Sequence, residues 1–226
     1  MTLVKICGIT EVEHAEAALE AGADMLGFVF APSRRQIATD AATEIIQRCR
    51  DSYSPDERRW SAVGVFTDQP FSFVEDTAAS CGLDVVQLSS GESVDASLSI
   101  GMPIFKAVHL SGLHPSVNPA NLAESLAETL RELRVLHPAS RLLLDSGGPG
   151  VWGGTGQTFD WRSIGQAARD FVVAGGLNPS NVGTAIAAMH PWAVDVSSGV
   201  ESGGRKDPEL IRRFIAAVRR TDNHEQ

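Results

Sequence analysis

The sequence is poor in cysteine and has no long hydrophobic run. Its three cysteines, Cys7, Cys49 and Cys81, are an odd number at irregular spacing, which argues against a disulfide framework and fits a reducing compartment. No apolar run approaches the roughly 18 residues that a membrane-spanning helix needs. The N-terminus also lacks a basic stretch followed by an apolar segment. We therefore expect a cytoplasmic protein that has no contact with a membrane.

Positive charge is scarce as well. The chain carries 19 basic and 28 acidic residues, for a net charge of −9. Such an excess of negative charge repels nucleic acid, so we expect no nucleic-acid partner. A small phosphorylated substrate remains compatible with this charge, because backbone amides bind phosphate without a cationic side chain.

Familiar metal and nucleotide motifs are missing too. The histidines show no metal-ligand spacing, and the chain has neither an H-E-x-x-H sequence nor a paired C-x-x-C. We therefore expect no metal. No G-x-G-x-x-G follows the first predicted strand, which argues against a dinucleotide cofactor.

What the chain does contain is a regular alternation of short apolar runs with amphipathic helical patterns. Strands are predicted at 4–8, 25–30, 62–67, 85–89, 104–109, 141–145, 171–175 and 193–197. Helices are predicted at 11–21, 39–50, 70–81, 118–136, 160–169, 179–189 and 207–220, while the connection at 90–101 is weakly patterned. Strands separated by helices pair in parallel through right-handed crossovers.

The number of these units decides the predicted fold. Eight strand–helix units favour the α/β class and a closed (β/α)8 TIM barrel over an open doubly wound sheet. With 43% apolar residues the chain can bury a large core, and no linker-like stretch interrupts the series. We therefore expect a single domain over residues 1–226.

Three helix starts are predicted from capping residues. Thr10 and Glu13 have the spacing of a capping box, in which each side chain satisfies a backbone amide of the first turn. Asn178 and Asp207 each precede a proline, the order expected of a cap followed by a first helical turn.

Residues with useful chemistry gather at the ends of predicted strands. They are Cys7 near the end of the first strand, Asp145 at the end of the sixth, Gly175 and Gly176 at the end of the seventh, and Ser197, Ser198 and Gly199 at the end of the eighth. Barrel enzymes carry their sites at the carboxyl ends of the strands, and these four strands are contiguous around a closed barrel. We expect these residues to share one rim.

Cys7 is the candidate base. Side chains alternate along a strand, so if Cys7 points into the barrel, Lys5 lies one layer below it. A cation there would favour the thiolate, since a thiol with an ordinary pKa of about 8.5 is mostly protonated at neutral pH. The alternative is that Cys7 is a small buried hydrophobic residue.

Asp145 is the candidate acid. It follows three leucines, and burial favours the protonated form of a carboxyl, which a general acid requires. The alternative is a helix cap or turn residue. The glycine-rich segment 147–156 is predicted to be a lid over the substrate with Trp152 as its cover, or else a surface loop.

Two anion-binding features complete the predicted site. Loops after the seventh and eighth strands often bind phosphate in this fold, although their glycines could also serve tight turns. Arg34 or Arg35 could clamp a substrate carboxylate through a two-pronged contact, whereas surface arginines are usually solvated. His109 ends the fifth strand and could be a base by position, but a structural role is the simpler interpretation.

Taken in order, these pieces resemble the phosphoribosylanthranilate isomerase family of tryptophan biosynthesis. The most specific blocks are VKICGIT (4–10), GGTGQTFDW (153–161) and VDVSSGVE (194–201). Further matching stretches are AGADMLGFVF (21–30), APSRRQI (31–37), GVF (64–66), DVVQL (84–88), LLLDS (142–146) and AGGLNPSNV (174–182). The resemblance covers essentially the whole chain.

The resemblance implies a barrel without a cofactor that acts on N-(5′-phosphoribosyl)anthranilate. The product would be 1-(2-carboxyphenylamino)-1-deoxyribulose 5-phosphate, formed by an Amadori rearrangement with Asp145 as general acid and Cys7 as general base. Arg35 would contact the anthranilate portion, and we also expect Lys5 to contact the substrate. The phosphate-binding residues would be Gly176, Ser197, Ser198 and Gly199. We expect a monomer or a homodimer.

One position departs from the family pattern. Members usually continue the fourth strand as Q-L-H-G, whereas this chain has Ser89 and Ser90 after Gln87 and Leu88. A rim histidine is therefore missing, and whether His109 compensates for it is open at this point.

Two other functions are compatible with a phosphate-binding barrel. A sugar-phosphate isomerase similar to the histidine-pathway enzyme would use a pair of aspartates, and Cys7 at the first position argues against it. A non-catalytic binder of a phosphorylated ligand is the alternative outside enzymes.

Overall fold

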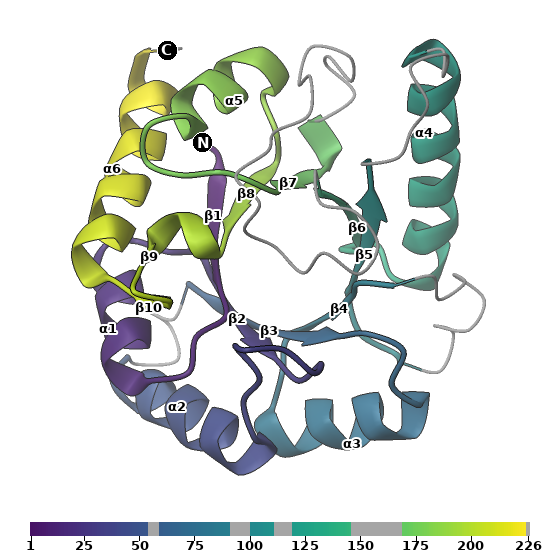
Figure 1. Cartoon of the computed structure of the whole chain (residues 1–226). Helices are drawn as coiled ribbons and strands as arrows, with labels where there is room; N and C mark the ends of the chain where they lie inside the picture. Colours follow the sequence, from purple (N-terminus) through teal and green to yellow (C-terminus); the bar gives the residue numbers. More distant parts are fainter. Residues whose placement is uncertain (54–58, 91–99, 111–118, 146–168, 225–226) are drawn as a thin grey trace.

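The computed structural model describes residues 1–53, 59–90, 100–110, 119–145 and 169–224. Within them, eight parallel strands form a closed barrel in which each strand hydrogen-bonds to the next and β8 returns to β1 (Figure 1). The strands are β1 (Leu3–Cys7), β2 (Met25–Val29), β3 (Ser61–Phe66), β4 (Val85–Leu88), β5 (Ile104–His109), β6 (Arg141–Asp145), β7 (Val172–Ala174) and β8 (Ala193–Val196). The predicted α/β class and TIM barrel are confirmed, and every predicted strand end lies within one residue of the observed end.

Helices surround the barrel on its outer side (Figure 1). They are α1 (Val12–Glu20), α2 (Thr39–Asp51), α3 (Phe71–Cys81), α4 (Pro119–Leu136), α5 (Val182–Met189) and α6 (Pro208–His224). The predicted lid at 147–156 with Trp152, the predicted helix at 160–169 apart from its last residue, and most of the connection at 90–101 lie outside the described residues. None of the helices described is long and apolar enough to cross a membrane.

The barrel strands bury side chains on both faces. Residues such as Met25, Val63 and Phe105 form a core made only of strand residues and the segments beside them, which fills the barrel interior. The alternate positions, such as Val4 and Ile6, pack into a second core together with residues of the helices. Successive residues of a strand face opposite cores. This alternation therefore determines which side chains of β1 point into the barrel.

Two of the three predicted helix starts are wrong. The α1 helix begins at Val12 after Glu11, with no side-chain cap, because the Glu11 carboxylate instead accepts two hydrogen bonds of 2.7 Å from Arg205. The α5 helix begins at Val182, since Asn178 forms a separate turn ahead of it and accepts a 2.9 Å bond from the Ser180 amide.

The third start is confirmed. The Asp207 side chain accepts hydrogen bonds from the backbone amides of Glu209 and Leu210, at 2.9 and 3.2 Å. The cap begins α6, the helix that holds the start of the chain in place.

This α6 helix ties the first strand to the end of the barrel. The carboxylate of Asp222 accepts a 2.9 Å hydrogen bond from the amide of Thr2 and a 2.8 Å bond from its hydroxyl, and both residues are buried. Arg219 donates to the Thr2 carbonyl at 2.6 Å and to Asp24 at 2.9 Å. The register of β1 therefore depends on contacts with residues more than 200 positions away.

Removing this tie should destabilise the whole barrel. We expect Asp222→Ala to lower the free energy of unfolding by about 2–4 kcal/mol, because two buried donors on Thr2 lose a charged acceptor. Urea unfolding followed by circular dichroism measures the loss. The control is Arg212→Ala, which removes an exposed pair with Glu209 on the same helix and should cost less than about 0.5 kcal/mol. Equal losses in the two variants would contradict the assignment.

Candidate active site

Cys7 and Lys5 both point into the barrel from β1. Val4 and Ile6 face the outer core, and Lys5 has no exposed surface. Gly27 pairs with Cys7 in the neighbouring strand, and a Cβ atom there would lie 2.9 Å from the Cys7 sulfur and 3.1 Å from the Lys5 nitrogen. The missing side chain of Gly27 is therefore what allows the thiol and the ammonium to stand together.

A buried ion pair lies beneath the thiol. The Lys5 ammonium donates a 3.0 Å hydrogen bond to Asp195, its register partner on β8, which is only 8% exposed. Burial alone would lower the pKa of Lys5, but the Asp195 carboxylate and then Cys7 raise it, so the ammonium stays charged. The pair also joins the first and last strands of the barrel.

The pKa of the Cys7 thiol is raised. Burial raises this pKa, Lys5 lowers it, and Asp195 raises it again, with a net increase. Lys5 lowers the pKa of Cys7, as predicted from its place one layer below the thiol. Burial outweighs the cation, and Asp195 cancels part of the charge of that cation.

The predicted phosphate-binding loops lie in contact with each other. A Cβ atom on Gly199 would lie 1.8 Å from the carbonyl oxygen of Leu177, so the loop after β8 presses against the loop after β7. Gly176 has a φ of 65°, in the left-handed region that favours glycine. Its carbonyl accepts a 2.9 Å bond from Asn181 at the start of α5. Ser198 lies in the short 3-10 helix that includes Gly199.

The loop after β8 is also joined to β1. The Ser197 hydroxyl donates a 3.0 Å hydrogen bond to the carbonyl oxygen of Cys7. The structure thus brings Cys7 and Ser197 together, as their shared place at the strand ends predicts.

Asp145 ends β6, between His109 on β5 and Ala174 on β7. It is partly exposed. Burial is the main influence that raises the pKa of Asp195, and the charge of Asp145 adds to it. Asp145 therefore lies within electrostatic range of the Lys5–Asp195 pair below Cys7, on the same rim.

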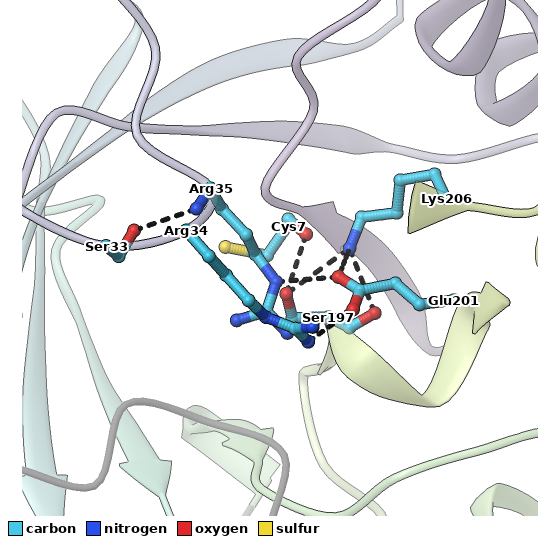
Figure 2. Close-up of polar contacts among 7 residues, drawn as sticks. All are labelled: Cys7, Ser33, Arg34, Arg35, Ser197, Glu201 and Lys206. Carbon is cyan, nitrogen blue, oxygen red and sulfur yellow. Dashed lines mark hydrogen bonds and ion pairs between the residues drawn. The ribbon is translucent and has the colours of Figure 1, made fainter. Parts of the chain in front are cut away.

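Arg35 approaches Cys7 from the loop after β2, as Figure 2 shows. It is buried, and it forms a two-pronged pair with Glu201 through its Nε at 2.6 Å and its Nη2 at 3.1 Å. The same carboxylate accepts a 2.6 Å bond from Arg34, whose side chain is 55% exposed. Lys206 donates to Glu201 at 2.8 Å and to the Ser197 carbonyl at 3.0 Å (Figure 2).

An imidazole lies beside the position where the resemblance expects a histidine. Nε2 of His109 lies 3.0 Å from the carbonyl oxygen of Ser89. A carbonyl only accepts, so Nε2 carries the proton and donates. The Nδ1 atom is buried and has no hydrogen-bond partner in the described part of the chain. The Ser89 hydroxyl accepts a 3.0 Å bond from Gln87.

Sequence reasoning missed four residues of this region: Gly27, Asp195, Glu201 and Lys206. For Asp195 a signal was present, since it interrupts the buried apolar strand at 193–196. Glu201 lies in the VDVSSGVE block, but nothing in that block indicates that its partner is an arginine 166 positions earlier. Gly27 and Lys206 carry no local signal.

Comparison with known proteins identifies the relatives of this chain. The sequence profile of the N-(5′-phosphoribosyl)anthranilate (PRA) isomerase family matches residues 4–217. The N-(5′-phosphoribosyl)anthranilate isomerase of Desulforudis audaxviator is 46% identical over 221 residues, which are 97% of this chain and 98% of the relative. The enzyme of Roseiflexus castenholzii is 41% identical, over 96% of this chain and 98% of its own length.

Solved structures give the same result. The phosphoribosyl anthranilate isomerase of Thermotoga maritima matches with a TM-score of 0.78 and 37% identity, over 97% of this chain and 99% of that one. A phosphoribosyl anthranilate isomerase in complex with reduced 1-(o-carboxyphenylamino)-1-deoxyribulose 5-phosphate matches with a TM-score of 0.75 and 35% identity over the same shares. A third structure, with a TM-score of 0.75 and 34% identity over 97% of this chain and 99% of its own, contains monomers of the dimeric T. maritima enzyme. For this chain, monomer or homodimer stays a prediction.

The protonation state of Cys7 can be tested by alkylation. Because the net pKa of Cys7 is raised, we expect its reaction with iodoacetamide to reach half-maximal rate at a pH above about 8.5, the ordinary value. Lys5→Met should move this midpoint to still higher pH. Mass spectrometry of the Cys7 peptide measures the rate, and the urea-unfolded chain supplies the unperturbed midpoint.

Cys49 serves as the internal reference in the same samples, since burial raises its pKa to about 11. A Cys7 midpoint at or below that of the unfolded chain would show that the site activates the thiol at rest.

Proposed function

The chain belongs to the N-(5′-phosphoribosyl)anthranilate isomerase family. From that premise we propose that it catalyses the Amadori rearrangement of N-(5′-phosphoribosyl)anthranilate. This reaction would be the third step from chorismate in tryptophan biosynthesis. The product is 1-(2-carboxyphenylamino)-1-deoxyribulose 5-phosphate. The observation that carries this proposal is the convergence of Cys7, Asp145 and the two contacting glycine loops on one rim. The reaction needs one proton delivered, one proton removed and an anchor for a distal phosphate.

Asp145 acts first, as the general acid. It donates a proton to the furanose ring oxygen, the bond from that oxygen to C1′ breaks, and the anthranilate nitrogen supplies its electron pair to form the iminium. The position of Asp145 at the end of β6, partly exposed, suits contact with a sugar ring bound over the rim.

Cys7 acts second, as the general base. The thiolate fraction of Cys7 removes the proton from C2′, and the electron pair neutralises the iminium. The resulting enolamine becomes the ketone when C1′ gains a proton and the 2′-hydroxyl loses one. No oxidant or reductant enters, because the product is an isomer of the substrate. The charged Lys5, with Asp195 holding it in place at 3.0 Å, stabilises the thiolate form needed in this step.

The two ends of the substrate are bound by opposite parts of the rim. Backbone amides of the loops containing Gly176, Ser197, Ser198 and Gly199 hold the phosphate, a role that does not require a cationic side chain. Arg35 holds the anthranilate carboxylate by a two-pronged contact. Lys5 is completely buried beneath Cys7, so its proposed role in binding the substrate is exerted through the thiol.

Removing either proton-transfer group should abolish most turnover. We expect Cys7→Ala and Asp145→Asn each to lower kcat by about 10²–10⁴-fold, the usual contribution of a general acid or base. The loss of substrate fluorescence follows the reaction. Cys49→Ala is the matched control, since it removes a buried thiol far from the rim and should leave kcat unchanged.

Three results would overturn the proposal in different ways. Normal turnover in both Cys7→Ala and Asp145→Asn would refute the mechanism. Turnover of the histidine-pathway aminoaldose alone would change the substrate. Tight binding of a product analogue without turnover, together with failure to rescue a tryptophan auxotroph lacking this step, would indicate a non-catalytic binder.

A further inference from the structure

The Glu201 carboxylate gathers three cations at the edge of the site. Its side chain is 5% exposed, and it accepts hydrogen bonds from Arg34 at 2.6 Å, Arg35 at 2.6 Å and Lys206 at 2.8 Å (Figure 2). Burial raises the pKa of Glu201, but the bonds from Arg35 and Lys206 lower it further, so the carboxylate is ionised. These four side chains together carry two excess positive charges, in a chain whose net charge is −9.

Glu201 occupies only one edge of the Arg35 guanidinium. The bonds use Nε and Nη2, whereas a guanidinium has five N–H donors arranged on two edges. The Nη1 atom donates to no side chain or backbone group among the described residues. Arg35 is therefore fixed in orientation by one carboxylate while a second edge is left to bind another.

The stem of Arg35 lies across the backbone that follows Cys7. A Cβ atom on Gly8 would lie 2.6 Å from Cδ of Arg35, and Gly8 has a φ of 83°. The guanidinium is thus held close to the proposed base by packing on one side and by Glu201 on the other. A rotation of the guanidinium would break both Glu201 bonds at once.

Lys206 connects Glu201 to the predicted phosphate-binding loop after β8. Glu201 and Lys206 face each other in the antiparallel pair of β9 (Glu201–Ser202) and β10 (Arg205–Lys206). The Lys206 ammonium also donates to the Ser197 carbonyl at 3.0 Å, and Ser197 donates to the Cys7 carbonyl. One carboxylate therefore links the arginine after β2 with the loop after β8.

We infer that Glu201 is a positioning residue that orients the free edge of Arg35 toward the carboxylate of the substrate. The inference rests on the proposed function, because it assumes that Arg35 binds the anthranilate carboxylate. Glu201 touches no reacting atom and acts through Arg35. It makes the enzyme selective for a substrate with a carboxylate, since an arginine that is already oriented loses less freedom when it binds a planar anion.

The test compares two substrates in the Glu201→Gln variant. One is N-(5′-phosphoribosyl)anthranilate and the other is N-(5′-phosphoribosyl)aniline, which lacks the carboxylate. We expect Glu201→Gln to lower kcat/KM for the carboxylated substrate about tenfold or more, mainly through KM, because a charge-assisted bond fixes Arg35. The value for the aniline analogue should change little. A merely structural role would lower both values equally.

The matched control is Glu11→Gln, which removes the charge and one of the two acceptor oxygens from an exposed contact with Nη2 of Arg205 and should leave the preference for the carboxylated substrate intact. Arg35→Gln tests the premise and should lose that preference by itself. In the Arg35→Gln background, adding Glu201→Gln should have no further effect on the preference.

The outcomes separate the two proposals. Wild-type protein without turnover contradicts the proposed function. If Arg35→Gln keeps the preference, the premise about the carboxylate fails. If Arg35→Gln loses the preference and Glu201→Gln keeps it, only the inference is overturned. Should Glu201→Gln not fold, Glu201→Asp takes its place with the same criteria, because it keeps the charge and shortens the reach by one methylene.

Discussion

The buried pair of Lys5 and Asp195 is the interaction on which the rest of the site depends. It joins β1 to β8, the two strands that close the barrel, and it lies directly below Cys7. Two charges removed from water are costly unless each has its partner at good geometry, so the 3.0 Å contact fixes the register of these strands as well as the local charge. Gly27 on β2 supplies the space that this arrangement needs.

Much of the fold could be predicted from the sequence because parallel barrel strands leave a local signature. Each strand is a short apolar run followed by a helical pattern, and the β1 alternation of Val4 and Ile6 against Lys5 and Cys7 gives its inward face. The helix starts were less predictable. The cap predicted at Thr10 is wrong: α1 begins after Glu11, and the Glu11 carboxylate binds Arg205, which is 194 positions away.

The candidate site, like the fold, could be predicted from the sequence only in part. Strand ends could be located, so Cys7, Asp145 and the glycine loops could be assigned to one rim before the structure was known. The Lys5 effect on the pKa of Cys7 could be predicted from strand alternation, but its balance against burial and Asp195 could not, because it depends on how deeply the closed barrel buries the thiol. The contact between Arg35 and Glu201 could not be predicted from local sequence. The loops after β2 and β8 come together only because both strands pair with β1 in the closed barrel.

Ser89 stands at the rim position where the resemblance expects a histidine, and an imidazole from the neighbouring strand lies beside it. Strands β4 and β5 are hydrogen-bonded neighbours, and Leu88 at the end of β4 pairs with Lys106, before the end of β5. The side chain of His109, the last residue of β5, reaches the Ser89 carbonyl, to which its Nε2 donates. The Nδ1 atom of the same ring is buried and has no hydrogen-bond partner among the described residues. An imidazole is thus present at this part of the rim although β4 does not supply it, since neighbouring strands can deliver the same group to nearly the same place.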